Sequence, residues 1–158
     1  RVPLRFHRFS ADLRESATLS ARRAAPIEIP LCFMIRSEVF IEEQGVPAQI
    51  VMDGLDADCA QFIAIVNDEP AGSARLRFIS QSEAKAERVA VLQASRGRGL
   101  GIGLMRAMER EARVMGIGSV VLHSQASAVG FYEGIGYVRD GDSFVEADIV
   151  HYKMRKAV

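Results

Sequence analysis

Arginine and glycine alternate over a short stretch of the chain, Arg96 to Gly101, in the order R-G-R-G-L-G. Glycine adopts positive φ without steric cost and lets the backbone come close to a ligand. A β-branched run from Val89 to Val91 precedes the stretch, and a helical pattern follows it. The first turn of a helix carries unpaired N–H groups and a partial positive charge, both of which attract phosphate. The stretch therefore predicts a loop that binds a phosphorylated ligand.

The spacing of the glycines excludes two common nucleotide-binding loops. The dinucleotide fingerprint G-x-G-x-x-G is not completed from Gly97, Gly99 or Gly101, and no Lys-Ser or Lys-Thr pair follows to complete a P-loop. The order R-x-x-G-x-G is met at Arg96, Gly99 and Gly101, directly after the expected strand. This order resembles the acyl-coenzyme A loop of the GNAT superfamily of N-acetyltransferases, which binds the pyrophosphate of the coenzyme.

Two further segments resemble the same superfamily. The segment S-A-V-G-F-Y-E-G-I-G-Y, Ser127 to Tyr137, is similar to its A-x-x-F-Y-x-x-x-G-F/Y motif and stands one strand after the helix of the glycine loop. The segment I-R-S-E-V-F-I-E-E-Q-G-V-P, Ile35 to Pro47, resembles a pattern in one bacterial subgroup, where it lies beside the acceptor side of the cleft. The resemblance covers about residues 29–156.

The resemblance implies acetyl-CoA as co-substrate, no metal, and a strand that splays from its neighbour so that the pantetheine lies in the gap. Backbone N–H groups freed there would bind the pantetheine and the thioester oxygen. It assigns coenzyme binding to the strand, the loop and the first helical turn, namely to Val89, Ala90, Val91, Arg96, Gly97, Arg98, Gly99, Leu100, Gly101 and Ile102.

Acetyl transfer from a thioester to an amine needs a neutral amine and a proton for the leaving thiolate. An alkylammonium has a pKa of about 10.4, so it must lose a proton to a base or a water chain. By the resemblance, Tyr132 is the general acid that protonates the sulfur. The alternative interpretation is a packed aromatic residue whose hydroxyl is hydrogen-bonded.

Glu87 is the predicted general base. It is expected on the same strand face as Val89 and Val91, and members of the superfamily often carry a carboxylate on this strand. Glu87 could instead pair with a neighbouring arginine. His123 and His151 are the other candidates for the base, each also interpretable as a structural histidine on or beside a strand.

Hydrophobic periodicity predicts the elements that position these residues. Strands are expected at 61–66, 71–79, 119–123, 137–138 and 150–155 and in the run that ends at 92, and helices at 30–45, 99–115 and 126–134. Before them we expect a strand at 4–9 and a helix from Ser10 that Pro26 ends. This order is the GNAT order, and it predicts an α/β (α+β) fold with a mixed, mostly antiparallel central sheet flanked by helices.

Charged residues outside the motifs suggest no specific ligand. The strand at 71–79 has one polar face that includes Arg75 and Arg77, and with Arg36 these side chains could receive an acidic substrate or form a solvated face. The acidic loop at 53–58 lacks the frame of an EF-hand and is interpreted as a solvated turn.

Length and composition are typical of one globular domain, residues 1–158, with 49% hydrophobic and 25% charged residues. Basic and acidic residues balance at 20 each, so neither nucleic acid nor an anionic membrane is expected as a partner. No apolar run reaches the roughly 20 residues of a membrane helix. Cys32 and Cys59 form no C-x-x-C pair and are typical of a reducing compartment, so we expect a cytoplasmic protein.

These observations together predict an enzyme that moves an acetyl group from acetyl-CoA directly to a primary amine of a small molecule or peptide. Two alternatives stay open. One is a non-catalytic acyl-CoA-binding regulator that retains the loop, and the other is an acyl-homoserine-lactone synthase, whose early helix carries a similar V-F-x-E segment. The sequence does not identify the acceptor, and a homodimer is one of the assemblies that it leaves open.

Overall fold

The computed structural model describes residues 18–158 of the chain. The strand expected at 4–9 and the first part of the helix expected from Ser10 lie outside these residues. The prediction of a helix over the last part of that segment is wrong, because Leu19–Arg23 form a strand, β1. β1 pairs antiparallel with residues 62–66, and this interstrand pairing outweighs the helical periodicity of a short segment.

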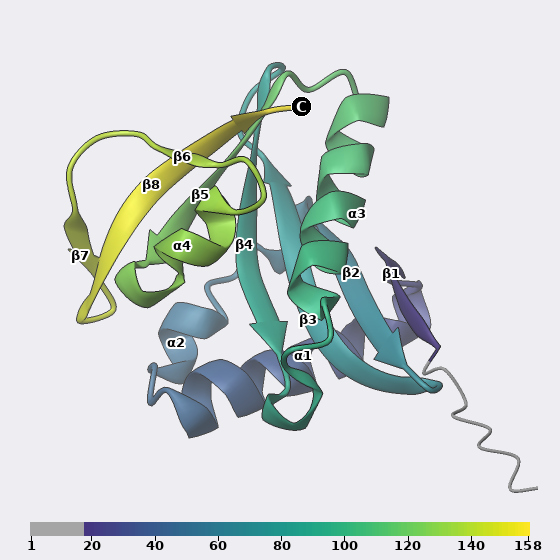
Figure 1. Cartoon of the computed structure of the whole chain (residues 1–158). Helices are drawn as coiled ribbons and strands as arrows, with labels where there is room; N and C mark the ends of the chain where they lie inside the picture. Colours follow the sequence, from purple (N-terminus) through teal and green to yellow (C-terminus); the bar gives the residue numbers. More distant parts are fainter. Residues whose placement is uncertain (1–17) are drawn as a thin grey trace, which may run out of the picture.

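Within residues 18–158, eight strands form one sheet. Their bounds are β1 (Leu19–Arg23), β2 (Cys59–Val66), β3 (Glu69–Phe78), β4 (Glu83–Val91), β5 (Ser119–Gln125), β6 (Val138–Arg139), β7 (Phe144–Glu146) and β8 (Ile149–Ala157). The order is β1-β2-β3-β4-β5-β8-β6, and β7 pairs with the opposite end of β8 from β6 (Figure 1). β4 and β5 run parallel and the other pairs run antiparallel, so the predicted mixed, mostly antiparallel sheet is confirmed.

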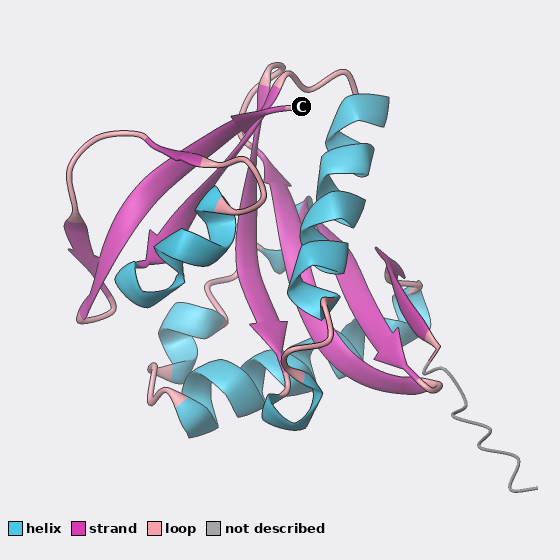
Figure 2. Cartoon of the chain, in the orientation of Figure 1, coloured by secondary structure: helices cyan, strands magenta, loops and turns pink. Residues whose placement is uncertain are grey.

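Helices cover both faces of this sheet (Figure 2). Their bounds are η1 (Pro26–Glu28), α1 (Ile29–Arg36), η2 (Ser37–Glu43), α2 (Ala48–Val51), η3 (Asp56–Asp58), η4 (Gln93–Ser95), α3 (Leu100–Val114), η5 (Ala126–Ala128) and α4 (Val129–Glu133). α3 packs against β1 to β4 on one face, and α1 packs against β2 to β4 on the other. In the described part of the chain, no helix is both long enough and apolar enough to cross a bilayer.

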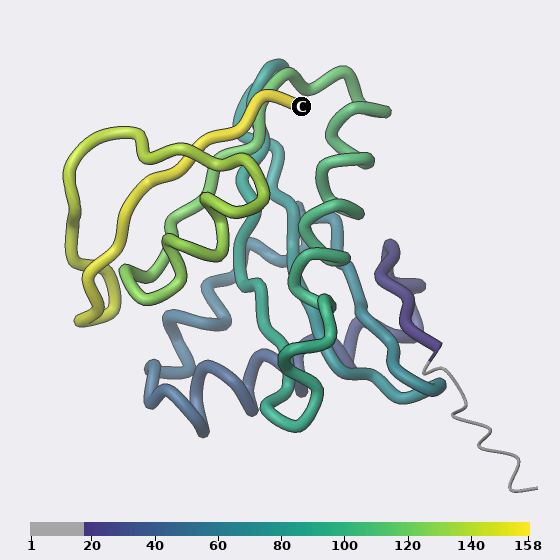
Figure 3. Tube along the Cα trace, in the orientation of Figure 1, coloured from purple at the N-terminus to yellow at the C-terminus, as the bar shows by residue number. Residues whose placement is uncertain are grey.

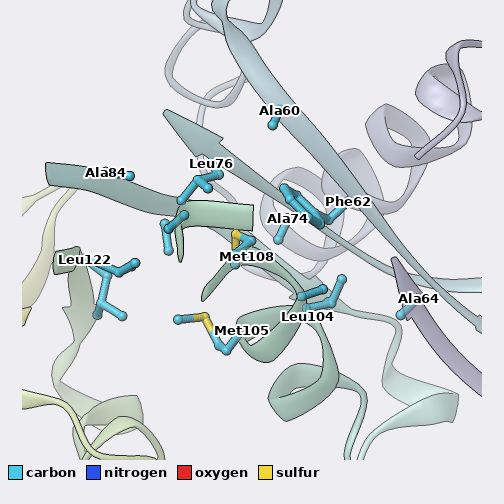
Figure 4. Close-up of a cluster of buried hydrophobic side chains, with 14 of the residues drawn as sticks. Ala60, Phe62, Ala64, Ala74, Leu76, Ala84, Leu104, Met105, Met108 and Leu122 are labelled. Atoms are coloured by element: carbon cyan, nitrogen blue, oxygen red, sulfur yellow. The ribbon is translucent and has the colours of Figure 1, made fainter. Parts of the chain in front are cut away.

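α3 supplies the centre of the hydrophobic core. Its side chains Leu104, Met105 and Met108 are fully buried and fall on one face at helical spacing. Figure 4 shows them among the sheet residues Phe62 and Leu76, with which they form one cluster. Burying side chains of this size contributes roughly 1.5–3 kcal/mol each. This packing holds the N-terminus of α3 beside the end of β4.

The predicted helix at 30–45 is confirmed, but it is not α-helical throughout. Ser37–Glu43 forms a π-helix, and the N–H of Gln44 still donates to the Val39 carbonyl five residues back, at 3.2 Å. Gly45, with a φ of +71°, ends the segment. π-helical turns are rare and often occur at functional sites, and the helical periodicity of the sequence does not predict this one.

β4 is irregular at Arg88, which has a positive φ of 56°. The register with β3 shifts between Glu87 and Ala90, as expected where a bulge inserts an extra residue. The insertion exchanges the two faces of the strand. Val89 and Val91 therefore pack against the core beneath α3, whereas Glu87 lies on the opposite face. The prediction that Glu87 shares a strand face with these valines is wrong.

The polar face of β3 is buried rather than solvated. Arg75 is fully buried, as is Arg36 on α1. Asp53 Oδ2 lies 2.7 Å from NH2 of Arg75, and Asp56 Oδ1 lies 2.7 Å from NH1 of Arg36. The acidic loop at 53–58 is thus the counter-charge of the two buried arginines and not a plain solvated turn. Neither arginine is free to receive an acidic substrate, because the chain's own carboxylates pair with them.

The β7–β8 hairpin is an element that the sequence does not indicate. Its two-residue turn consists of Ala147 (φ 50°) and Asp148 (φ 60°), both with positive φ. Such turns favour Asn-Gly or Asp-Gly, and this chain has neither pair there.

Candidate active site

β4 and β5 are paired over only part of their length. Their parallel register joins 83–85 to 119–121 and ends there, and the two strands diverge beyond it (Figure 3). The gap opens into a cavity of about 460 Å³. Residues of η2, α2, α4 and the β7–β8 hairpin complete its wall. The predicted residues that line this cavity are Val89, Ala90, Val91, Arg96, Tyr132 and Glu87, together with the alternative base candidates His123 and His151.

The glycine loop lies between the end of β4 and the first turn of α3. Gly97 (φ 78°) and Gly99 (φ 82°) are both in the left-handed region, and a Cβ built on either would meet open space. The first hydrogen bond of the helix runs from the Gly103 N–H to the Gly99 carbonyl at 3.0 Å. The N–H groups of residues 100–102 therefore have no intrahelical acceptor. The backbone can approach an anion here, as the sequence predicts.

The two arginines of the loop differ in their surroundings. Arg96 Nε donates to the Val91 carbonyl at 3.0 Å, and its NH2 donates to Glu43 Oε1 at 2.7 Å. Its guanidinium thus links the loop to the end of η2. Arg98 is exposed. The phosphate contacts predicted for both side chains stay predictions.

Tyr132 lies on α4, with its ring held edge-on between Phe131 (5.0 Å between centroids) and Tyr137 (5.9 Å). Burial raises the pKa of its hydroxyl to about 12. Burial is the one cause of this shift, and no side-chain hydrogen bond within residues 18–158 contributes to it, unlike the alternative of a packed, hydrogen-bonded tyrosine. The phenol is thus protonated at neutral pH and faces the cavity.

Glu87 lies at the inner end of the cavity among cations. Its Oε2 accepts from Arg75 Nε at 2.9 Å, its Oε1 accepts from Arg77 NH2 at 2.9 Å, and Lys85 Nζ lies 3.3 Å from Oε1. Burial by itself raises the pKa of this carboxyl, but the Arg77 hydrogen bond and the charges of Arg75 and Lys85 outweigh it, and the pKa is about 2. A carboxylate so stabilised in its ionised form accepts protons poorly. The geometry does not favour Glu87 as the base.

The two candidate histidines lie together where β5 meets the β7–β8 hairpin. The rings of His123 and His151 both contact Phe144, at 4.8 Å and 5.8 Å between centroids. Glu146 Oε2 lies 3.4 Å from Nδ1 of His123 and 3.9 Å from Nε2 of His151. All three polar residues line the cavity. Across residues 18–158, no group of three or more His, Cys, Asp or Glu is placed to hold a metal ion.

η2 lies at the cavity wall, near the cleft as the resemblance implies, and makes contacts that the sequence does not predict. Its consecutive end residues reach both sides of the gap, because Glu43 binds Arg96 beside β4 while Gln44 Oε1 accepts from Gln125 Nε2 of β5 at 3.0 Å. The only signal in the sequence is the E-V-F-I-E-E-Q segment itself, which predicts a position near the cleft but no contact.

Residues 32–158 match the family description "Acetyltransferase (GNAT) domain". The chain belongs to the GNAT acetyltransferase family. The fold predicted from the resemblance is thus confirmed.

Individual members of the GNAT family resemble the chain over most of its length. A Bacillus subtilis (strain 168) protein named as an acetyltransferase is 36% identical over 132 residues, covering 82% of this chain and 89% of the relative. A solved structure named as an N-acetyltransferase, from Lactobacillus plantarum, matches with a TM-score of 0.80 and 27% identity, covering 89% of this chain and 97% of that one. An acyl-CoA N-acyltransferase structure from Pseudomonas aeruginosa matches with a TM-score of 0.75 and 30% identity, covering 90% and 100%.

Proposed function

We propose that this GNAT protein transfers an acetyl group from acetyl-CoA to a primary amine of a small molecule or peptide. One observation carries the proposal: β4 loses its β5 partner at the same end where the glycine loop and the N-terminus of α3 leave N–H groups unpaired. The proposed phosphate site therefore lies at the end of the gap between β4 and β5, and the gap is wide enough for an added strand.

The shape of the loop fits the pyrophosphate of coenzyme A. The open space above Gly97 and Gly99 leaves room for phosphate oxygens, and the helix N-terminus attracts them. The pantetheine would then lie along Val89 to Val91 in the gap, where backbone groups of β4 that lack a β5 partner can bind it as an added strand would.

The chemistry of the inner cavity fits acetyl transfer. Attack of a neutral amine on the thioester carbonyl forms a C–N bond, and the C–S bond then breaks. Tyr132 is protonated at neutral pH and would deliver a proton to the departing sulfur. A thiolate leaves more readily when it is protonated, because the free thiol has a pKa near 8.5. The position of Tyr132 on the cavity wall supports this role.

The experiment has two parts. The protein is incubated with acetyl-CoA and a panel of primary amines, and released thiol is followed, which separates an enzyme from a binder of acyl-CoA. In parallel, coenzyme A is titrated calorimetrically into the protein and into Gly99→Asp, where a carboxylate would face the pyrophosphate. We expect binding to the first and at least tenfold weaker binding to the second.

Gly116→Asp is the matched control for this substitution. Gly116 also has a positive φ (75°) and open space around its Cβ position, but it follows the other end of α3. The backbone strain is therefore comparable while the loop is untouched. Equal coenzyme affinity in Gly99→Asp and Gly116→Asp would remove the loop from the site.

A further inference from the structure

The two histidines of the cavity carry their ring protons on different nitrogens. Nδ1 of His151 lies 2.7 Å from the carbonyl oxygen of Ile149. A carbonyl oxygen can only accept a hydrogen bond, so the proton must be on Nδ1. In this tautomer the lone pair is on Nε2, and within residues 18–158 no hydrogen bond engages that nitrogen.

His123 has the reverse arrangement. Its Nδ1 lies 3.2 Å from Nζ of Lys85, which can only donate, and 3.5 Å from Oε1 of Glu146, which can only accept. The shorter contact, with Lys85, decides that Nδ1 accepts. Nδ1 therefore supplies the lone pair, and the ring proton is on Nε2. Burial and the charge of Lys85 lower the pKa of this imidazole, so the ring is neutral at neutral pH. Neither nitrogen of His123 is free to take a proton from a substrate.

The surroundings of His151 suit a group that gains a proton. Its ring stacks on Phe144 with an interplanar angle of 22°, which fixes its plane. β7 contributes Glu146, whose Oε2 lies 3.9 Å from Nε2, and β5 contributes His123, with Lys85 of β4 beyond it. The Glu146 carboxylate lies beside Nε2 without occupying it through a hydrogen bond.

We propose that His151 is the general base that takes a proton from the acceptor ammonium at Nε2, an inference that rests on the proposed function. The N–H bond breaks, its electron pair stays on nitrogen, and the neutral amine attacks the thioester carbonyl. Tyr132 gives its proton to the sulfur as the C–S bond breaks, and the second N–H proton, lost as the amide forms, returns through water to the Tyr132 phenolate. Water takes the first proton from His151, so one proton is released per acetyl group.

The test compares two amines that differ in their charge at neutral pH. Propylamine is almost entirely protonated there, whereas methoxyamine is neutral and needs no initial deprotonation. In His151→Asn the amide N–H can still donate to Ile149 while the Nε2 lone pair is lost. We expect turnover with propylamine to fall by about 10²–10⁴-fold and turnover with methoxyamine to fall at least tenfold less.

His123→Asn is the matched control, because it removes the neighbouring imidazole of the same cavity. Its effect should be equal on the two amines. Calorimetric titration with coenzyme A and thermal melting show whether either variant has lost the cavity or the fold. Equal losses on both amines in His151→Asn, or retained turnover with propylamine, would overturn the assignment.

A second measurement on the unsubstituted protein does not require a known acceptor. Long-range ¹H–¹⁵N correlation spectra distinguish Nδ1–H from Nε2–H imidazoles. We expect His151 in the Nδ1–H form and His123 in the Nε2–H form at neutral pH. An Nε2–H form of His151 would refute the inference even if amines are acetylated. Conversely, a protein that acetylates no amine would refute the proposed function. The spectrum would still test whether Nε2 of His151 carries the lone pair that the inference requires.

Discussion

Two ionisable side chains of the cavity wall differ because of what surrounds them. Burial without a polar partner raises the pKa of Tyr132 to about 12. Glu87 is also buried, but the hydrogen bond from Arg77 and the charge of Arg75 hold its pKa at about 2. The phenol is thus a proton donor held in its neutral form, and the carboxylate is a fixed anion that holds cations in place.

Tyr132→Phe tests the acid directly, because it removes the hydroxyl and keeps the ring between Phe131 and Tyr137. Loss of one acid–base group predicts a decrease in kcat of about 10²–10⁴-fold with coenzyme A affinity nearly unchanged. Steady-state kinetics and calorimetry measure the two quantities. Tyr152→Phe is the control, since Tyr152 lies on β8, paired with Ser124 of β5, but is not part of the cavity wall.

Two results would contradict the role of Tyr132. Turnover could survive in Tyr132→Phe, which would mean that the thiolate leaves unassisted or with a proton from water. Coenzyme binding could instead fall in step with turnover, which would make the residue a wall of the cavity.

At the scale of elements, η2 holds the two sides of the gap together. Its Glu43 pairs with Arg96 of the glycine loop, and the hydrogen bond from Arg96 lowers the pKa of the Glu43 carboxyl. Both side chains are exposed by about two fifths, 41% for Arg96 and 36% for Glu43. Exposed pairs contribute little stability, whereas a partly desolvated guanidinium–phosphate contact is stronger. Arg96 should therefore leave Glu43 when the coenzyme binds.

If Arg96 leaves Glu43 for the coenzyme, substitutions of these two residues should change the KM for acetyl-CoA in opposite directions. Arg96→Ala should raise KM roughly tenfold or more and affect kcat less, because a phosphate contact is lost. Glu43→Gln should lower KM by up to about fivefold, because no competing carboxylate holds the guanidinium. Kinetics at low and high salt provide the check, since the effect of Arg96→Ala should shrink with salt. A raised KM in Glu43→Gln would instead mean that the pair positions the loop.

At the scale of the whole molecule, one charged cluster joins α1, the acidic loop, β3 and β4. Arg75 is its centre, bound to Asp53, Asp56 and Glu87, and Asp56 extends it to Arg36. Removing one member of a buried ion cluster leaves its partners uncompensated, which is costly. The acceptor side of the cavity therefore depends on charges that no substrate needs to touch.

This cluster predicts a loss of stability in acid. The pKa of Glu87 is about 2 in the folded chain and about 4.3 in an unfolded one, so its contribution is complete above the unfolded value. It is lost as the pH falls from about 5 through 2, and amounts to roughly 2–3 kcal/mol. Urea unfolding across this range should show a steeper decline in the parent protein than in Glu87→Gln. In Glu69→Gln, which changes an exposed glutamate, the free energy of unfolding should decline as in the parent protein. An equal decline in Glu87→Gln would show that Glu87 is not the source of the acid sensitivity.

Much of the architecture is already determined by local sequence. The helix at 99–115, the strands on either side of it and the helix at 126–134 have strong periodicities or glycine boundaries, and the structure has all of them. The glycine loop is also determined by local sequence, because its strand, glycines and helix N-terminus are contiguous in the chain. Tyr132 lies within a motif of the same kind.

Tertiary structure alone decided the rest of the site. The bulge at Arg88 exchanges the two faces of β4. Strict alternation of side chains along the sequence therefore places Glu87 on the face of Val89 and Val91, which is the wrong face. The alternating pattern of its strand predicts that Arg75 is solvated. Arg75 is buried instead, because a loop 22 positions away in the sequence supplies Asp53 as its counter-charge. The protonated nitrogen of His151 depends on the carbonyl that its backbone conformation places at Nδ1. The sequence by itself determined the local elements and the glycine loop, since their signals lie within a few residues. Only the fold decided which charges meet and which imidazole nitrogen stays free, because those depend on contacts between distant segments.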